Sequence, residues 1–539
     1  MDQLINAHGL RKVIFWLFAL TLLIGISTHI VRTVINIKGN TVHAIFIGFL
    51  VWLLAFFFKF GFNNTHPKSG KIYWPRLSIP IILTVFWAAN NDLFGLFDVS
   101  AAIFHLQNGV EYKGLQGDIF TFWIYLTLGA FAIASLSYLA RRDIRLKKIE
   151  TFMALPLLLI NPVTLYAFDR ISSQIWEPID LTAHYVESKP QYIQSKALAD
   201  NARKNLLLIY VESVEDTFRH ESFGDAFDPF RRIERRGVRL NGVHEVQDTG
   251  WTIAGITASQ CGVPALSYGL IRKNSMSRLE SFLPGAHCLG TVLSGQGYET
   301  VFMGGGDLAF AGKRRFFNTH GYKEIWGTSD YPKQAQGPLV KWGILDDVLF
   351  DFAFEKLREL ESKDKPYLFS MLTLSAHGPA GFPAPRCENY TELTQHEDTV
   401  LKAVSCTGIL IEHFLEKAEE EGLLKDTVIV ILNDHLGHEH TQKKNLKALN
   451  RQNFTTILNS ELSPAIRDVN GSMIDMYPTL LELTGLTLPE NRQGLGVSLL
   501  SSEPSLLSQY GLKSLNKAIT LDNKLRAKLW AIGDGVSKP

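Results

Sequence analysis

The first 170 residues alternate between long apolar stretches and short basic segments. A helix needs about 20 apolar residues to cross a bilayer core of about 30 Å. Five stretches approach that length and predict an all-α bundle with membrane spans over residues 13–31, 42–60, 77–97, 119–140 and 151–168. The third stretch runs into Asn90, Asn91 and Asp92, which predicts a polar outer end, a helix face turned into the bundle, or a kink at the membrane surface.

Lysine and arginine are concentrated ahead of the first span, between the second and third, and between the fourth and fifth. Cytoplasmic loops carry such an excess, so we expect the N-terminus inside and everything beyond residue 170 outside. The first span is too long for a cleaved signal peptide and is expected to remain as an anchor. Residues 171–203 read as a juxtamembrane linker. Its residues Trp176, Tyr185 and Tyr192 lie either at the lipid–water interface or in an ordinary amphipathic connector.

The remainder of the chain predicts a single α/β domain over residues 204–539 with a central, mostly parallel sheet. Three continuous apolar runs have the composition of strands that are buried on both faces, namely 205–211, 366–375 and 427–433. Helical stretches at 345–361 and 398–421 lie between them, and such alternation favours parallel strands with covering helices.

The amino-acid composition and net charge exclude several classes of protein. The chain has 539 residues, of which 46% are hydrophobic and 20% are charged, and its net charge is +1. This excludes disordered chains, collagen-like repeats and small disulfide scaffolds. The predicted outer domain is mildly acidic and lacks a basic stripe, so we expect no nucleic-acid partner.

Each of the three apolar runs ends on residues that can bind a metal or a phosphate. Glu212 follows the first run, His377 the second, and Asp434 with His435 the third. Ligands of open α/β sheets bind beyond the carboxyl ends of the strands. Two carboxylates and an imidazole form a mixed oxygen and nitrogen set that suits zinc or manganese.

A fourth segment of interest is Gly250-Trp251-Thr252, which precedes a helix-like run of small residues. A threonine at the start of a helix can be an ordinary N-cap. It can also be a nucleophile whose hydroxyl is ionised by a metal, beside the free N–H groups of the helix end.

All four cysteines, Cys261, Cys288, Cys387 and Cys406, lie in the part predicted to be outside. An even number in an oxidising compartment suggests two disulfides. Proximity favours Cys261–Cys288 and Cys387–Cys406, although three pairings are possible. A zinc knuckle is the alternative, but the chain has no C-x-x-C spacing.

Taken together, the ordered motifs V-E-S, G-W-T-I-A-G-x-x-A-S-Q-C-G, G-G-G-D-L-x-F-A-G-K, L-S-A-H-G-P and N-D-H-L resemble those of the phosphoglycerol transferase I family. That family shares the alkaline phosphatase/sulfatase fold with lipoteichoic acid synthases and lipid A phosphoethanolamine transferases. The run DMYPTLLELTGL (475–486) resembles a late helix of the superfamily. The predicted five-span bundle resembles the layout of lipoteichoic acid synthases.

The resemblance implies roles for individual residues. Glu212, Asp434 and His435 would bind a divalent metal, with Mn²⁺ as the first choice and Zn²⁺ or Mg²⁺ as alternatives. Thr252 would be both fourth ligand and nucleophile, and His377 would contact the phosphate or the attacking or leaving oxygen.

Further residues would bind the substrate. Lys313 falls where lipoteichoic acid synthases carry an arginine, and it would neutralise phosphate charge as a point cation. Gly304, Gly305, Gly306 and Asp307 would shape the pocket near the glycerol, and Trp251 would contact the substrate beside the nucleophile.

The implied activity is transfer of phosphoglycerol from phosphatidylglycerol to a periplasmic glucan or other envelope glycan, with release of diacylglycerol. The location would be a bacterial inner membrane, with the catalytic domain in the periplasm. The alternatives are a phosphoethanolamine transferase and a non-catalytic membrane scaffold. A sulfatase activity is disfavoured, because the motif C/S-x-P-x-R is absent at this position. Nothing in the sequence indicates an oligomeric state.

The chain departs from the expected family pattern after Asp434-His435, where His438 and His440 follow. These histidines predict a second metal site, contacts to the acceptor, or solvated loop residues.

Overall fold

The computed structural model describes residues 75–94, 116–142, 144–165, 179–187, 204–266, 281–390, 393, 395–438 and 440–531. The chain divides into two compact units, residues 1–82 with 126–159 and residues 83–125 with 160–539. The spans predicted over 13–31 and 42–60 lie outside the described residues.

Three helices correspond to the last three predicted spans: α3 (Ser78–Phe94), α5 (Gln116–Arg142) and α6 (Ile144–Leu159). Helix α3 continues through the polar stretch at its end. Helix α6 begins earlier than predicted, within the basic segment, and ends earlier as well. Pro162 disfavours helical geometry at Asn161, whose Oδ1 instead accepts a hydrogen bond from Val163 N at 3.0 Å. Within the described residues, no helix combines the length and apolar character that a bilayer crossing requires.

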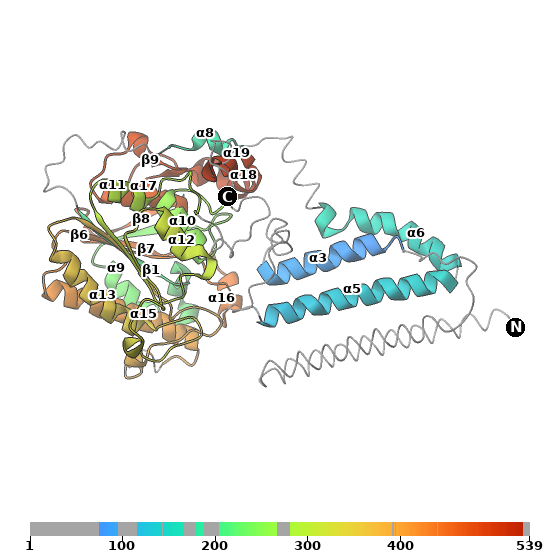
Figure 1. Ribbon diagram of the computed structural model, residues 1–539, viewed down its shortest axis with the longest axis horizontal. Helices are drawn as coiled ribbons and strands as arrows, with labels where there is room; N and C mark the ends of the chain where they lie inside the picture. The colour runs from blue at the N-terminus through green and yellow to red at the C-terminus, as the bar shows by residue number, and fades with distance from the viewer. Residues whose placement is uncertain are drawn as a thin grey trace. The chain divides into compact units, whose positions relative to one another are not determined.

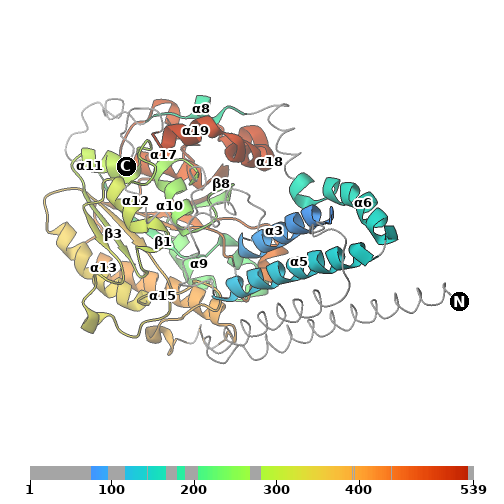
Figure 2. The same cartoon turned by 45° about the vertical axis from the view of Figure 1, so that its right-hand side comes forward.

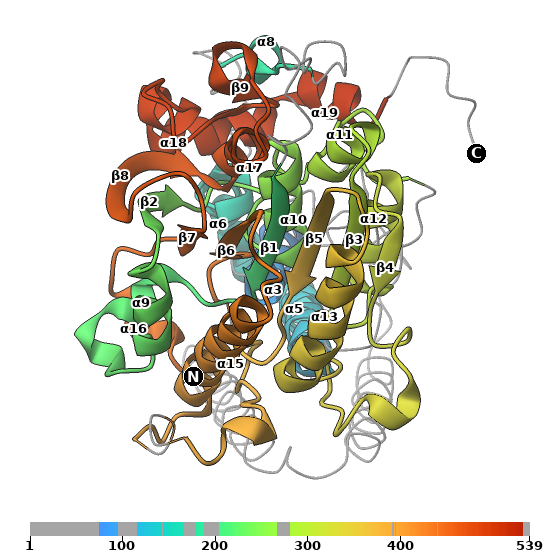
Figure 3. The ribbon, with the colours of Figure 1, turned by 90° about the vertical axis from the view of Figure 1, so that its left-hand side faces the viewer.

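An eight-stranded sheet forms the centre of the C-terminal α/β domain, in the order β4-β3-β5-β1-β6-β7-β2-β8 (Figure 3). The strands are β1 (Asn205–Val211), β2 (Val238–His244), β3 (Glu299–Gly304), β4 (Glu324–Trp326), β5 (Tyr367–Leu372), β6 (Thr427–Asn433), β7 (Thr455–Leu458) and β8 (Ala465–Ser472). Strand β7 is antiparallel to both of its neighbours, and every other pair in this sheet is parallel. The predicted α/β domain with a mostly parallel sheet is therefore confirmed.

Helices cover both faces of the sheet (Figures 1 and 2). Alternate residues of β1 enter two separate hydrophobic cores, because successive side chains of a strand point to opposite faces. One core contains residues of α10 (Thr252–Cys261), α11 (Leu289–Gly295), α12 (Lys313–Thr319), α17 (Met476–Leu483), α18 (Leu506–Leu521) and α19 (Asn523–Leu529). The other core contains residues of α9 (Asp228–Glu234), α13 (Asp346–Glu361), α15 (Thr399–Glu420) and α16 (Lys443–Lys447).

Part of the predicted linker belongs to this domain. Residues 179–187 contain the short helix α8 (Leu181–His184), and Leu181 is fully buried. Val186 pairs with Gly494 through two backbone hydrogen bonds of 2.8 and 3.0 Å. Tyr185 packs against the hydrophobic core. Trp176 and Tyr192 lie outside the described residues.

Two disulfides, Cys261–Cys288 and Cys387–Cys406, are present, and this is the pairing that sequence proximity favours. The first joins the last residue of α10 to the residue before α11. The second joins the turn at 385–387 to α15. No cysteine remains free, so none is available for a zinc knuckle.

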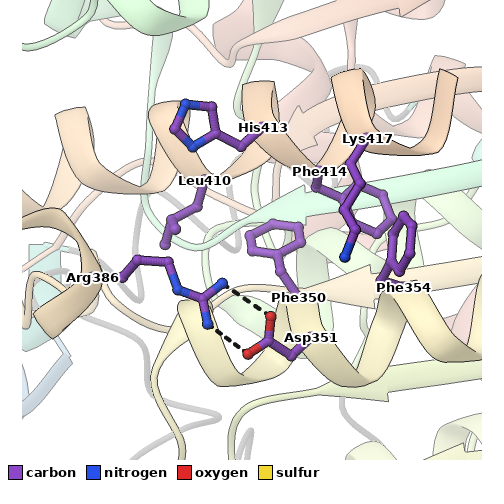
Figure 4. A pocket seen from close by; sticks show the side chains of 8 residues that line it. All are labelled: Phe350, Asp351, Phe354, Arg386, Leu410, His413, Phe414 and Lys417. Carbon is purple, nitrogen blue, oxygen red and sulfur yellow. Dashed lines mark hydrogen bonds and ion pairs between the residues drawn. The ribbon is translucent and has the colours of Figure 1, made fainter. Parts of the chain in front are cut away.

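A small groove lies between α13 and α15 (Figure 4). Its lining is aromatic and charged: Phe350, Asp351, Phe354, Arg386, Leu410, His413, Phe414 and Lys417. Arg386 forms a two-pronged ion pair with Asp351, at 2.9 and 2.5 Å. None of the residues predicted to carry chemistry lines this groove.

Candidate active site

The register of the two central strands places the first two predicted metal ligands side by side. Val211 of β1 pairs with Asn433 of β6, so the residues that follow them, Glu212 and Asp434, leave the same edge of the sheet together. Ser213 has a positive φ of 59°, and its backbone N–H donates to Asp434 Oδ1 at 2.9 Å. This turn holds the two strand ends together beyond the last ladder bond.

His435 completes a compact cluster with these two carboxylates. One ligand atom from each residue lies within 4.8 Å of the others, and all three side chains are buried. His435 Nε2 is 3.4 Å from Glu212 Oε1 and 3.3 Å from Asp434 Oδ2. His435 Nδ1 donates to the carbonyl of Leu436 at 2.8 Å, which leaves Nε2 directed toward the carboxylates as the ligating nitrogen.

The electrostatics of the cluster fit a divalent cation. Burial and the charge of Glu212 raise the pKa of Asp434 to about 8. Burial opposes ionisation of Glu212 as well, but the hydrogen bond and charge of His435 outweigh it and hold the Glu212 pKa below its ordinary value. Burial lowers the pKa of His435, but the two carboxylates raise it to about 10. Asp434 Oδ2 accepts no hydrogen bond within the described part of the chain. A bound cation would compensate both buried negative charges.

Thr252 is the first residue of α10 and lies next to this cluster. Trp251 occupies the N-cap position, so the threonine side chain is not the helix cap. Its Oγ1 instead donates to Glu212 Oε2 at 3.3 Å. The helix packs closely on the metal-ligand loop, because a Cβ at Gly255 would lie 1.6 Å from the carbonyl oxygen of Asp434. The positive end of α10 therefore faces the cluster.

Lys313, the first residue of α12, provides a buried cation near the cluster. Its side chain is 7% exposed, and its Nζ donates to the carbonyl of Phe310 at 3.1 Å. Burial lowers the pKa of Lys313 to about 8, although the negative charges of Glu212, Asp307 and Asp434 act to raise it.

The glycines after β3 shape this edge through their backbone. A Cβ at Gly305 would lie 2.8 Å from the carbonyl oxygen of Ile344, whose N–H donates to Gly305 O at 3.0 Å. Asp307 is exposed, and its Oδ1 accepts a hydrogen bond from Ala309 N at 2.8 Å. Trp251 is half-buried against the core around α10, so its contact with substrate stays a prediction.

His377 lies in the loop after β5, at the same edge of the sheet. Its Nδ1 donates to the carbonyl of Gly378 at 2.8 Å, and its ring contacts Trp342 in a tilted arrangement with centroids 4.3 Å apart. The buried Asp346 holds this loop by accepting hydrogen bonds from Leu374 N at 2.6 Å and Ser375 N at 3.1 Å.

Sequence reasoning missed Glu245, the residue directly after β2. Strand β2 runs in the same direction as β1, because the antiparallel β7 separates it from β6. Glu245 Oε2 accepts a hydrogen bond from Leu436 N at 2.9 Å, and burial raises its pKa. The strand-end rule identifies this carboxylate once VRLNGVH is recognised as a strand.

The two additional histidines have defined surroundings. His438 Nε2 forms a hydrogen bond with the carbonyl of Gly250, and its ring stacks on His435 with centroids 4.8 Å apart. His440 is buried, with Phe218 6.0 Å away, so it is not a solvated loop residue. Within the described residues, neither joins a group of three or more metal-competent side chains.

Comparison with known proteins assigns the family. The sulfatase family profile matches residues 204–486, which is just over half of the chain and includes every residue of the cluster. The chain belongs to the sulfatase family. This membership covers the domain that carries the candidate site.

Among its relatives, this sulfatase-family chain is similar to proteins named phosphoglycerol transferase I. It is 30% identical over 466 residues to the protein from Xanthomonas axonopodis pv. citri, covering 84% of this chain and 64% of that protein. It is 29% identical over 457 residues to the protein from Escherichia coli O127:H6, covering 81% and 58%. The chain thus spans less than two thirds of the length of these relatives.

Solved structures to which the chain is similar include an alkaline phosphatase superfamily protein from Vibrio parahaemolyticus. The two chains are 25% identical with a TM-score of 0.46, over 56% of this chain and 70% of that one. The lipoteichoic acid synthase LtaP from Listeria monocytogenes is 17% identical with a TM-score of 0.44, over 57% and 80%.

Proposed function

We propose that this protein transfers phosphoglycerol from phosphatidylglycerol to a periplasmic glucan or another envelope glycan and releases diacylglycerol. The observation that carries the proposal is the Thr252 hydroxyl, which lies 3.3 Å from Glu212 beside the buried cluster. The relatives named phosphoglycerol transferase I, similar over 84% of the chain, support the choice of transferred group.

Glu212, Asp434 and His435 would hold a divalent cation, with Mn²⁺ as the first choice and Zn²⁺ or Mg²⁺ as alternatives. When bound, such a cation stabilises negative charge on the nucleophile and on the phosphoryl oxygens. Thr252 Oγ1 lies close enough to Glu212 to be the fourth group at this site.

In the first half-reaction, Thr252 Oγ attacks the phosphorus of the donor. The Oγ–P bond forms, the bond from phosphorus to the diacylglycerol oxygen breaks, and the threonine proton passes to that oxygen. Because His377 Nδ1 donates to the Gly378 carbonyl, Nε2 is the nitrogen that can relay this proton. The second half-reaction reverses the scheme: an acceptor hydroxyl displaces Thr252 and regenerates its hydroxyl.

Charge on the transferred group would be stabilised from two sides. The buried Lys313 ammonium interacts electrostatically with Glu212 and Asp434, and the N-terminus of α10 presents its positive end at the cluster. Both act in a largely buried site, where electrostatic interactions are stronger than in water.

We also propose that the N-terminal helices anchor the protein in the inner membrane, with the N-terminus cytoplasmic and the catalytic domain periplasmic. Of 16 exposed large hydrophobic side chains in the described residues, 13 lie between residues 79 and 165, which fits a lipid-facing surface. The two disulfides fit an oxidising compartment. An anchor would keep the site beside a donor that stays in the bilayer.

The test uses the full chain with Mn²⁺, a glucan acceptor, and labelled phosphatidylglycerol or phosphatidylethanolamine in separate reactions. We expect diacylglycerol release from phosphatidylglycerol only, and its loss in Thr252→Ala. Release from phosphatidylethanolamine only would instead assign the protein to the phosphoethanolamine transferases. If the metal is bound but neither lipid releases diacylglycerol, the result would contradict a transferase of either kind.

A further inference from the structure

Two hydrogen bonds connect the loop that carries the metal ligands to the segment before Thr252, and both donors lie on the metal-ligand loop. Leu436 N donates to Glu245 Oε2 at 2.9 Å. His438 Nε2 forms a hydrogen bond with the carbonyl oxygen of Gly250. Because a carbonyl oxygen only accepts, His438 Nε2 is the donor. The two bonds tie both ends of the segment 245–250 to the residues that follow Asp434-His435.

The contacts around these bonds are close. A Cβ at Gly250 would lie 2.7 Å from Glu245 Oε1, so the carboxylate lies directly against the backbone two residues before Thr252. The His438 ring covers one face of the His435 ring, with an interplanar angle of 25°. Glu245 therefore contacts the backbone just before Thr252, and His438 contacts the predicted metal ligand His435.

The ligand loop is also held from its opposite side. Gly437 N donates to Glu215 Oε1 at 3.2 Å, and Arg451 Nη2 donates to the Gly437 carbonyl at 2.6 Å. The buried Glu215 forms an ion pair with the half-buried Arg451. The ion pair fixes the position of the metal-ligand loop through the backbone of Gly437. Glu245 and His438 then set the position of the segment before Thr252 relative to that loop.

We propose that Glu245 and His438 are positioning residues that couple metal loading to placement of the Thr252 nucleophile. The coupling rests on the proposed role of Thr252, whereas the effect on metal binding does not. Partners that orient a metal ligand typically change metal affinity by about 10- to 100-fold when removed. A nucleophile displaced by about 1 Å can lose about 100-fold in rate.

The experiment measures Mn²⁺ affinity of the metal-free full chain by calorimetric titration, and then the initial burst of diacylglycerol at saturating Mn²⁺. Glu245→Ala and His438→Ala are expected to weaken Mn²⁺ binding about 10- to 100-fold and to slow the burst even when the site is saturated. Glu245→Gln and His438→Gln keep an acceptor and a donor, respectively, and are expected to lie within a few-fold of wild type. Glu416→Ala and His413→Ala, exposed on α15, are the matched controls.

A further variant separates positioning from general loss of structure. Gly250→Ala pushes against the Glu245 carboxylate, so it should weaken Mn²⁺ binding in the wild type and add nothing in the Glu245→Ala background. Unchanged Mn²⁺ affinity in both alanine variants would overturn the proposal, as would a burst fully restored by saturating Mn²⁺. If wild type loads Mn²⁺ but releases no diacylglycerol, the proposed function fails, while the affinities and the Gly250→Ala comparison still test the two hydrogen bonds.

Discussion

Thr252 Oγ1 donates to Glu212 Oε2 across 3.3 Å, although the two residues are 40 positions apart and leave different strands of the sheet. This contact places a hydroxyl at the positive end of a helix and against a buried carboxylate. In the absence of substrate, that carboxylate is the group best placed to polarise the hydroxyl.

Replacing the threonine hydroxyl should stop the reaction without emptying the metal site. Thr252→Val keeps the shape of the side chain and is expected to reduce diacylglycerol release by at least about 1,000-fold, because a nucleophile cannot be replaced by the remaining groups. Thr257→Val on the same helix is the control, since that hydroxyl donates only to the Ile253 carbonyl. A phosphoglycerylated residue mapped by mass spectrometry to any position other than 252 would contradict the prediction.

The charge of Lys313 should set the alkaline limit of activity. Its pKa is lowered to about 8, so kcat/KM should fall about tenfold for each pH unit above about 8, as the ammonium loses its proton. Lys313→Arg keeps its charge at every accessible pH, so the alkaline fall in kcat/KM should begin at a higher pH in this variant. The measurement is a kcat/KM profile from pH 6 to 10, with the exposed Lys323→Arg as control. Identical alkaline limbs in wild type and Lys313→Arg would rule out this role for Lys313.

The two disulfides should contribute similarly to stability and differently to activity. They close loops with sequence separations of 27 and 19 residues, so removing either pair by alanine substitution is expected to cost about 3 kcal/mol. Only Cys261 lies on the helix that begins with Thr252. Loss of Cys261–Cys288 should therefore misplace Thr252 and lower kcat about tenfold, which corresponds to about 1.4 kcal/mol of activation free energy. Loss of Cys387–Cys406 should change kcat less than twofold, and equal effects on kcat would be inconsistent with this picture.

Asp475 should make stability depend on pH. It is buried at the start of α17, and burial raises its pKa to about 6. Because the folded pKa exceeds the unfolded one, the folded state binds the proton more tightly. Stability should therefore fall as the pH rises from about 4 to about 6, by at most about 3 kcal/mol, and stay at the lower level above that range.

Asp475→Asn cannot ionise and should lack this fall in stability. The difference in thermal unfolding temperature between the variant and the wild type, measured on the detergent-solubilised full chain from pH 4 to 7, should grow in favour of the variant up to about pH 6. A difference that stays constant over this range would show that Asp475 does not titrate as expected.

The strands that precede the predicted metal ligands could be predicted from the sequence because they lie in the centre of the sheet. The runs 205–211 and 427–433 are central strands buried on both faces, so they are apolar throughout and end abruptly at Glu212 and Asp434. Strand β2 has alternating burial and a glycine at φ +99° in its middle, so its sequence shows no such run. Glu245 was missed for that reason.

The position of Thr252 relative to the cluster was not accessible from spacing alone. It depends on the place of β2 in the sheet, where β6 and β7 lie between it and β1. It also depends on the close packing of α10 on the loop at Asp434, which the missing side chain of Gly255 allows. The resemblance to a known family singled out this threonine, whereas the residues alone favoured an ordinary N-cap. The hydrogen bonds of Glu245 and His438 join loops nearly 200 residues apart, and no local pattern encodes such a pair.

The antiparallel strand β7 has a consequence for the order in which the protein folds. Strand β2 precedes Thr252, yet Val238 pairs with Ile457 and Ala465, which are synthesised far later. Contacts of such long sequence separation form slowly and only after the chain has been delivered. A nascent chain that ends before β7 contains Thr252 but lacks both strands that pair with β2. Emergence of residues 455–472 is therefore the step at which β2, and with it the segment that leads to Thr252, can take its place in the sheet.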